Sequence, residues 1–525
     1  MNLSALDMST FVVYCVMLIG IAWWVSREKV GHTKDTKDYF LASKSLPWWA
    51  IGASLIAANI SAEQIIGMSG SGFAIGLAIA SYEWMAAITL LLVGKFFLPI
   101  FLKKGIYTMP QFLEERFDYR VRIVMAIFWL GVYTFVNLTA ILWLGALAIN
   151  TITGVDIVYG LVFLALFSIG YSIYGGLKAI ALTDIIQVVL LVFGGLLVSY
   201  LALNNISDSF GDGGGAWQGF SIMLAEVPEK FNMILDPSNE HYISLPGISV
   251  LIGGMWIMNL SYWGFNQYIT QRALAAKSLR DAQKGIAFAA FLKLLMPVIV
   301  VLPGIAAFML RPDLDMPDQA YPTMMQLVPH GLLGITFAAL VAAIASSLGS
   351  MTNSISTIFT VDIYKQLINP NASETRSVWV GRAAAGTAML IAVIVARPLL
   401  GQLDQAFQYI QEFTGFFTPG IVAIFMLGFF WKKATALSAL VAAIGSAVLS
   451  LALKLLWPAL PFMDRVGLVF LACIGLAVVI TLLSGAKEQE KAVHLDDIDF
   501  STTTGFNIAS IAVVLILIAL YAAWW

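Results

Sequence analysis

Charged residues are scarce in this chain of 525 residues: Asp, Glu, Lys and Arg together make up 11% of it. Soluble domains carry about 25%. Hydrophobic residues reach 60%, and this balance predicts an all-α polytopic membrane protein. The formal net charge is −2 and the basic residues are spread over short loops, so no surface for nucleic acid is expected.

Cysteine and histidine are also rare. The two cysteines, Cys15 and Cys473, lie inside apolar runs and predict neither a disulfide framework nor a metal site. The four histidines fall in expected loops or at the ends of expected spans, which argues against a histidine proton relay; they are His32, His241, His330 and His494.

Motifs for catalysis and nucleotide binding are missing as well. The sequence holds no GxGxxG or Walker-type pattern. No polar segment reaches the roughly 100 residues that a catalytic domain needs. We therefore expect neither an enzyme nor an ATP-driven pump, and no organic cofactor.

Long apolar runs dominate what is present. Counting segments of about 20 residues, the length that crosses the hydrocarbon core, gives about fourteen expected transmembrane helices. They lie near residues 8–26, 48–70, 74–102, 122–150, 156–174, 180–203, 246–268, 285–310, 331–358, 378–398, 405–430, 434–455, 464–484 and 505–525. Lys and Arg gather in the loops after the first, third, seventh, ninth, eleventh and thirteenth spans, so the pattern predicts both termini outside the cytoplasm.

Two of these spans are interrupted by polar residues at their middles, at 59–64 and at 259–264. A broken helix is tolerated in a membrane where protein or a water-filled cavity satisfies its free backbone groups, so such breaks predict a binding pathway. Ordinary kinks are the alternative. The broken spans are the second and the seventh, five crossings apart, which gives the two halves opposite orientation.

This spacing predicts an inverted repeat. The expected first repeat of five spans covers residues 45–204 and the second covers 245–431, with an extracellular loop at 205–244 between them. One extra transmembrane helix precedes the repeats at 1–30, and three follow at 432–525.

Several motifs together resemble the sodium/solute symporter family, most closely the bacterial sodium/galactose symporters of the sodium–glucose cotransporter type. They are residues 45–50, 57–64, 171–177 with Thr183 and Asp184, 259–271, Ser346 with Ser347, and 407–412. The resemblance implies a leucine-transporter-like 5+5 fold in the inner membrane of a cell. It also implies sodium-driven alternating access, with a sugar held between the repeats and the lipid bilayer as surroundings; the oligomeric state stays open.

Five residues match the sodium site of that family: Ala57, Ile60, Ala343, Ser346 and Ser347. Na⁺ prefers oxygen ligands, and an interrupted helix offers free carbonyls. The last three residues are spaced i, i+3 and i+4 and so share one helix face. The alternative is that both serines bond back to carbonyls of their own helix.

A sugar site needs donors and acceptors around a ring of hydroxyls, beside an aromatic face. The resemblance implies Gln64, Glu83, Asn259, Lys293 and Gln411 as hydroxyl partners, with Tyr262 stacking on the inner side as a gate. It implies Asn59, Met68, Tyr82, Phe407 and Trp263 as supporting and gating residues.

Depth in the membrane tests two of these residues. Lys293 lies about nine residues beyond the basic loop end, roughly 14 Å deep, where an unpaired ammonium is costly. We therefore expect it to face the pathway, paired with a carboxylate or bound to substrate. Glu83 falls either near the outer interface or in the site. Glu63, Asp184 and Glu412 are further candidates for charge within the membrane, and we assign them no substrate contact.

One position departs from the galactose-transporting pattern: Ala86 stands where a serine is expected. A hydroxyl contact is therefore missing, so the preferred epimer or ring substituent can differ from that of the galactose symporters. The resemblance implies galactose as the first expectation and glucose as the next. A sodium symporter for an amino acid or organic acid is the alternative, with Lys293 as counter-ion to a carboxylate, although Glu83 beside it argues against an anion. A channel or membrane enzyme is a further alternative, but no filter motif or catalytic set is present.

Overall fold

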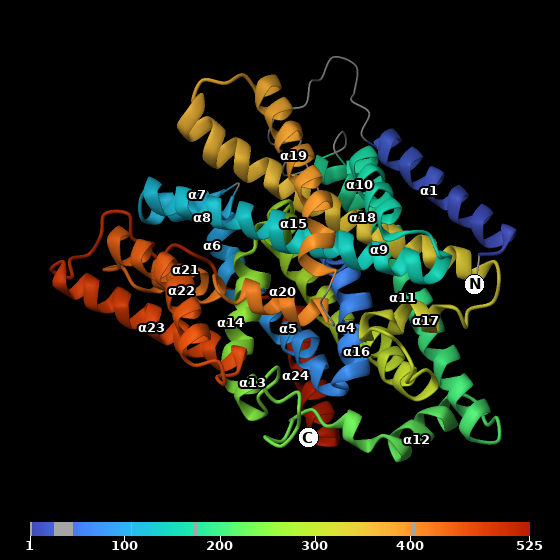
Figure 1. Ribbon diagram of the computed structural model, residues 1–525. Coiled ribbons are helices and arrows are strands. Elements are labelled where there is room, and N and C mark those ends of the chain that lie inside the picture. The colour runs from blue at the N-terminus through green and yellow to red at the C-terminus, as the bar shows by residue number, and fades with distance from the viewer. Residues whose placement is uncertain (1–2, 26–45, 107, 173–175, 402–404) are drawn as a thin grey trace.

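The computed structural model describes residues 3–25, 46–106, 108–172, 176–401 and 405–525. Helices make up nearly all of it, and the described residues contain no strand (Figure 1). The expected helix at 1–30 appears as α1 (Ala5–Val25). The α-helices in the range of the expected first repeat are α3 (Trp48–Asn59), α4 (Met68–Ala74), α5 (Ser81–Leu92), α6 (Leu98–Lys104), α7 (Met109–Arg116), α8 (Tyr119–Val132), α9 (Thr139–Thr153), α10 (Ile157–Ser172) and α11 (Gly176–Phe210).

The second half begins after α12 (Ala216–Glu226) and the short turn η6 (Pro228–Phe231) of the expected outer loop. Its α-helices are α13 (Ile248–Ile252), α14 (Gly254–Leu260), α15 (Gln267–Leu274), α16 (Leu279–Leu310), α17 (Ala320–Met325), α18 (Leu332–Ile358), α19 (Glu374–Leu400), α20 (Ala406–Thr414) and α21 (Thr418–Phe430). The C-terminal helices are α22 (Ala436–Leu456), α23 (Phe462–Leu483) and α24 (Thr504–Trp524).

Short π and 3-10 segments connect several of these helices within one span. The π segments are η2 (Glu63–Gly67), η4 (Val93–Phe97), η5 (Tyr133–Leu138), η7 (Ser261–Phe265) and η9 (Phe359–Ile368). The 3-10 turns besides η6 are η3 (Leu77–Ala80) and η8 (Pro317–Gln319). π turns often accompany functional sites. The segments η2 and η7 lie in the middles of the two spans that are expected to be broken, so we expect the site there.

Apolar helices long enough to cross a membrane number nine in the described residues, or eleven if each bent pair forms one span. The helix α10 and the apolar part of α1 are shorter than that limit. Each of the fourteen expected segments coincides with a helix or a run of helices, but the count of fourteen crossings stays a prediction.

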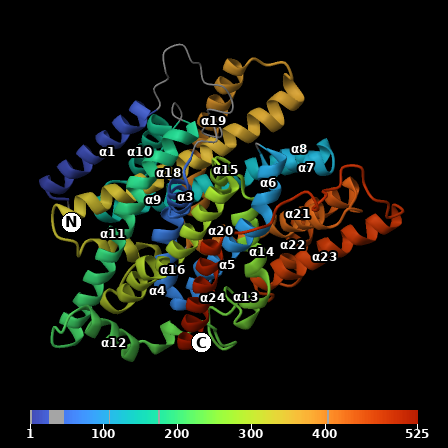
Figure 2. The same cartoon turned by 180° about the vertical axis from the view of Figure 1, so that it is seen from behind.

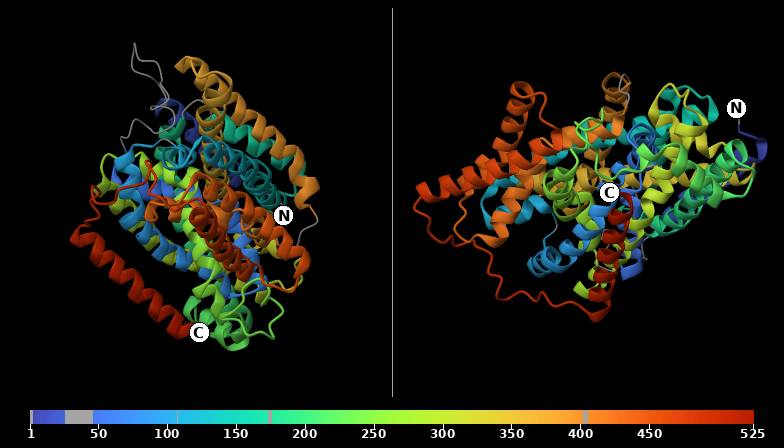
Figure 3. Two further views of the ribbon diagram at one scale, coloured as in Figure 1. Left: turned by 90° about the vertical axis from the view of Figure 1, so that its left-hand side faces the viewer. Right: turned by 90° about the horizontal axis from the view of Figure 1, so that it is seen from below.

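The helices pack around a common core, with the extra ones at the periphery. Viewed from behind, α24 lies beside α16, and the two helices are in contact (Figure 2). From below, α22 and α23 extend to the side opposite the N-terminus (Figure 3). These peripheral helices expose much of their apolar surface, as a lipid-facing helix does.

The first expected break is present. The helix α3 ends at Asn59, Ile60 leaves the helical conformation at φ −72° and ψ 79°, and the two halves of the span meet at 57°. The second break lies further along the chain than expected. Residues 259–264 stay helical through α14 and η7, and the chain becomes extended at Asn266, with φ −84° and ψ 123°. A third bend, of 43°, separates α20 from α21.

Glycines let α16 approach both halves of the bent second span. A methyl group on Gly285 would lie 2.7 Å from the carbonyl oxygen of Trp48, beside α3. A methyl group on Gly304 would lie 2.1 Å from the carbonyl oxygen of Ser69, in α4. Small residues permit such close helix packing in membranes, so α16 is held against the whole length of the bent span.

Three arginines assigned to cytoplasmic loops lie inside the protein, which corrects the sequence interpretation: Arg116, Arg122 and Arg272. Arg122 is 7% exposed and donates a 2.7 Å hydrogen bond to Asp362 in η9. Arg272 is fully buried within the bundle. A buried arginine requires hydrogen-bond acceptors. Arg122 and Arg272 each bond a carboxylate, and Arg116 donates to the backbone carbonyls of Gly428 and Trp431.

Candidate functional site

A polar chamber lies beside the first break and is lined by the second span (α3, η2 and α4), the third span (α5) and the seventh span (α14 with η7), together with α20. Ten residues expected in the substrate site line it: Asn59, Gln64, Met68, Tyr82, Glu83, Asn259, Tyr262, Trp263, Phe407 and Gln411. Ala86 and Met258 complete the wall, and Met258 has no counterpart in the sequence prediction.

Lys293 of α16 lies beside the chamber and bonds two of its lining residues. Its ammonium donates a 2.5 Å hydrogen bond to Glu83 Oε2 and a second, shorter one to Asn59 Oδ1. The same ammonium lies 4.8 Å from the centre of the Trp263 ring, a cation–π distance. Glu83 is 3% exposed, so it lies in the site and not at the outer interface. The two opposite charges compensate each other where neither could stand alone.

Tyr262 closes the side of the chamber where we expect the inner gate. Its hydroxyl accepts a 3.1 Å hydrogen bond from Asn59 Nδ2 and also bonds the hydroxyl of Tyr268. Asn59 therefore contacts both Lys293 and Tyr262 from the last position of α3. Asn59 thus lies where the prediction has it brace the break and the tyrosine, and its role stays a prediction.

Aromatic packing closes the side of the chamber where we expect the outer gate. The rings of Tyr82 and Phe407 meet edge to face with centroids 5.1 Å apart, and Met68 is fully buried against the same wall. The amides expected to bind hydroxyls stand between these two sides. Gln64 Oε1 accepts a 3.1 Å hydrogen bond from Ser61, and Asn259 Nδ2 donates a 3.2 Å bond to the carbonyl of Met255.

The five residues of the expected sodium site lie where α3 ends against α18. All five are buried, with exposures of 0–1%. Ser347 Oγ donates a 3.0 Å hydrogen bond to the carbonyl of Ala58, and Ser346 Oγ donates to Asp184 Oδ1. Neither of these two bonds returns to the serine's own helix, in contrast to the alternative interpretation. The carbonyl of Ile56 accepts from the backbone N–H of Ile60, where α3 ends. The last carbonyls of a helix have no partner one turn further on, so this junction offers oxygen atoms of the kind that Na⁺ prefers.

Arg272 was missed as a part of this region. Its guanidinium donates to Ser54 Oγ at 2.7 Å, to Asp184 Oδ2 at 3.3 Å, and to Ser350 Oγ on α18. Asp184 thus accepts from Ser346 with one oxygen and from Arg272 with the other. Its position four residues after Tyr268 and before the short apolar run Ala273–Ala276 is the one local sequence feature that distinguishes Arg272 from a loop arginine.

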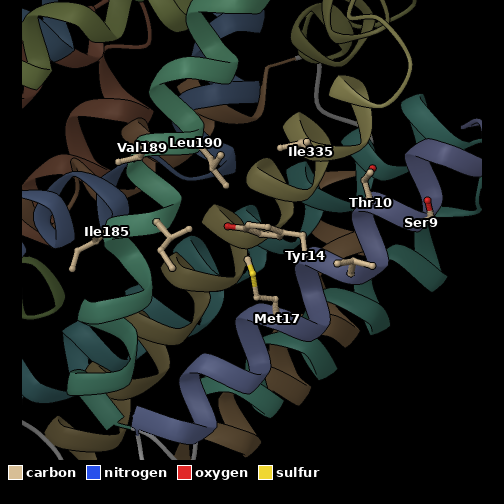
Figure 4. Close-up of a pocket in the computed structure, with 10 residues that line it drawn as sticks. Ser9, Thr10, Tyr14, Met17, Ile185, Val189, Leu190 and Ile335 are labelled. Atoms are coloured by element: carbon tan, nitrogen blue, oxygen red, sulfur yellow. The ribbon is translucent and has the colours of Figure 1, made fainter.

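A larger groove lies away from this site. It has a volume of about 670 Å³ and runs between α1, α11 and α18, lined by residues such as Tyr14, Met17, Val189 and Ile335 (Figure 4). Its wall is almost wholly apolar, and Val189 beside it is half exposed on the outer surface. Such a groove lacks the convergent polar groups of a site for a polar solute.

Comparison with known proteins identifies the family. Residues 39–445 match the model of the Sodium:solute symporter family. The chain belongs to this family. It is similar to a sodium/glucose cotransporter of Vibrio parahaemolyticus, with 51% identity over 100% of this chain and 99% of the relative. It is also 32% identical to the human sodium/myo-inositol cotransporter 2, over 81% of this chain and 66% of that one.

Solved structures show the same fold. A Na⁺-coupled sialic acid symporter in a substrate-bound outward-open state superposes with a TM-score of 0.79 at 23% identity, over 91% of this chain and 98% of that one. A nucleobase-cation-symport-1 family transporter in a closed conformation gives 0.53 at 14% identity, over 91% and 99%. The expected leucine-transporter-like fold is confirmed. The expectation of a transporter and not an enzyme is confirmed by the family.

Proposed function

We propose that this member of the sodium:solute symporter family imports a hexose, driven by an inward sodium gradient, by alternating access. The observation that carries the proposal is the chamber in which Lys293 and Glu83 stand together among amide side chains. Their charges cancel, while their remaining donors and acceptors suit hydroxyl groups. An organic acid would need an uncompensated cation, so the pairing favours the sugar over that alternative.

Coupling between ion and sugar follows from shared residues at the break. Ala58 accepts a hydrogen bond from Ser347, and the next residue, Asn59, bonds Lys293 and Tyr262. Sodium bound at Ala57, Ile60, Ala343, Ser346 and Ser347 would order the end of α3 and with it the sugar partners. Because both ligands then favour one arrangement, each tightens the other by the same factor.

The roles of the individual residues complete the proposal. Gln64, Glu83, Asn259, Lys293 and Gln411 bind hydroxyls, Tyr262 forms the inner gate, and Met68, Tyr82 and Phe407 form the outer gate. Galactose is our first choice, from the resemblance of the motifs. Glucose is the next, because Ala86 removes one hydroxyl partner of that pattern and a relative is named for glucose. The repeats at 45–204 and 245–431, the inner-membrane location and the extracytoplasmic termini belong to the same proposal.

The test is uptake of radiolabelled galactose and glucose into proteoliposomes, with an inward sodium gradient or with potassium replacing sodium. We expect sodium-dependent accumulation in the native chain and its loss in Ser346→Ala/Ser347→Ala. Thr10→Ala, in the apolar groove, is the matched control and keeps uptake. Binding of sodium without uptake of either sugar would instead assign the fold to another solute.

A further inference from the structure

A second polar chamber adjoins the first. Tyr262 and Gln411 line both, so these two side chains form the wall between them. The second chamber is formed by α8, η5, η7, α20 and α21. Its polar lining includes Glu63, Asn137, Asn266 and Thr414, and Trp129 supplies an aromatic face.

Chain direction places this chamber on the cytoplasmic side of the first. Asn266 follows Tyr262 in a segment that runs toward the basic loop after the seventh span. Thr414 follows Gln411 in a segment that runs toward Lys432 and Lys433. Glu63 precedes Gln64 in the second span, which runs the opposite way. All three therefore lie inward of their neighbours in the first chamber.

The side chains of the second chamber retain free hydrogen-bonding capacity. Glu63 is 3% exposed, and in the described part of the chain its carboxylate accepts one bond, from Asn137 Nδ2 at 3.4 Å. The hydroxyl of Thr414 is buried and has no partner among the described residues. Asn266 Oδ1 accepts from Tyr133, which leaves its amide nitrogen available. Buried polar groups of this kind require partners, and a ligand or water must supply them.

We infer that this chamber is a second hexose site, occupied after the sugar passes Tyr262 and before it reaches the cytoplasm. The inference rests on the proposed function. A carboxylate, an amide and a hydroxyl beside an indole ring match the alternating polar and apolar faces of a sugar ring. A turn of the Tyr262 side chain joins the two chambers into one passage. The bonds to Asn59 and Tyr268 hold this side chain closed in the structure described here.

The side on which sugar is offered separates this site from the first. Glu63→Gln keeps the shape of the side chain and removes its charge, Thr414→Val removes the hydroxyl, and Thr414→Trp fills the chamber. In inside-out membrane vesicles, where sugar enters from the cytoplasmic face, we expect each variant to raise the KM for radiolabelled galactose or glucose at least fivefold. Sodium-dependent binding of the same sugar from the outer face should change less than twofold.

Thr10→Trp, which places the same indole in the wide apolar groove, is the matched control and should leave both values unchanged. Cytoplasmic-face KM values within twofold of the native value for Glu63→Gln and both Thr414 variants would overturn the second site. An equal rise at both faces would reassign these residues to the first chamber. A native chain without sodium-driven sugar uptake would instead refute the proposed function itself.

Discussion

Lys293 and Glu83 form a 2.5 Å hydrogen-bonded ion pair in which neither side chain is more than 4% exposed. They come from α16 and α5, 210 positions apart in the chain. The pair joins the two expected repeats directly at the proposed sugar site. It is therefore a structural link as well as the pair that we propose contacts the substrate.

Removing one partner of this pair should be costly. We expect Glu83→Gln to lower the free energy of unfolding by about 3–5 kcal/mol, because it leaves a buried ammonium uncompensated. The double variant Glu83→Gln/Lys293→Met should recover part of this loss and still lack sugar uptake. Thermal unfolding in detergent and proteoliposome uptake measure the two effects. A double variant no more stable than Glu83→Gln would contradict the pairing as the cause.

Ala86 tests which hexose is preferred. Ala86→Ser adds a hydroxyl to the chamber wall, and one hydrogen bond contributes about 1 kcal/mol, or about fivefold. We expect the ratio of kcat/KM for galactose over glucose to rise by about this factor in competition assays. Ala87→Ser, at the next position along α5 and outside the chamber lining, is the control. An unchanged ratio would remove this position from the determinants of specificity.

The outer part of the site is held by a cluster of charges. Glu412, next to Gln411 on α20, accepts from Arg465 at 2.8 Å and lies 2.9 Å from the ammonium of Lys454. Both cations belong to the C-terminal helices α22 and α23. The cluster thus ties the helix that carries Phe407 and Gln411 to the periphery of the molecule.

We expect Glu412→Gln to raise the KM for sugar about fivefold, since a partly exposed charged bond contributes about 1 kcal/mol to the position of α20. Glu374→Gln removes a similar carboxylate, 3.0 Å from Lys365 on the cytoplasmic side, and serves as control. Initial rates of sodium-driven uptake give both KM values. A KM that changes equally in the two variants would show that the effect is not local to α20.

A pH effect is expected at the outer loop. The ammonium of Lys230 donates hydrogen bonds of 3.0 Å and 2.6 Å to the carbonyls of Phe73 and Ala74, at the end of α4. Burial lowers the pKa of Lys230 below its ordinary value of 10.5. The unfolded chain therefore binds this proton more tightly than the folded chain does. Stability should then rise as the pH increases through the interval between the lowered pKa and 10.5.

Lys230→Met lacks this contribution. The melting temperature of the native chain relative to that of the variant should rise by roughly 1–2 °C between neutral pH and pH 10. Lys277→Met, at a basic cytoplasmic loop, controls for the loss of a lysine as such. A difference between native chain and Lys230→Met that falls with pH would contradict the burial of the ammonium.

Local sequence patterns predict the spans and the chamber lining, but not the burial of the arginines. Polar residues such as Asn59 and Gln64 stand out within apolar spans, and the resemblance to a family indicates their neighbourhood, so the chamber lining could be predicted. The burial of Arg272 could not, because it depends on Asp184, 88 positions away. Arg122 likewise depends on Asp362, 240 positions away. Both arginines stand beside span ends, where a charge ordinarily belongs to a loop.

The second break shows the same limit. The run at 259–264 looks interrupted by its polar residues, yet Asn259 and Ser261 remain in helical turns, and the chain departs from the helix only at Asn266. Short polar side chains satisfy part of their hydrogen bonding against their own helix, as Asn259 does with Met255. Composition therefore locates the region of the break and not its residue.

The close packing of α16 has a consequence for how the molecule bends. Its Gly285 end is pressed against α3 and its Gly304 end against α4, on opposite sides of the 57° bend. Between these two contacts lie Pro297 and Pro303, where α16 loses backbone hydrogen bonds. The bend of the second span and the prolines of α16 thus lie between the same two close contacts, so we expect a change in the bend of one span to displace the other.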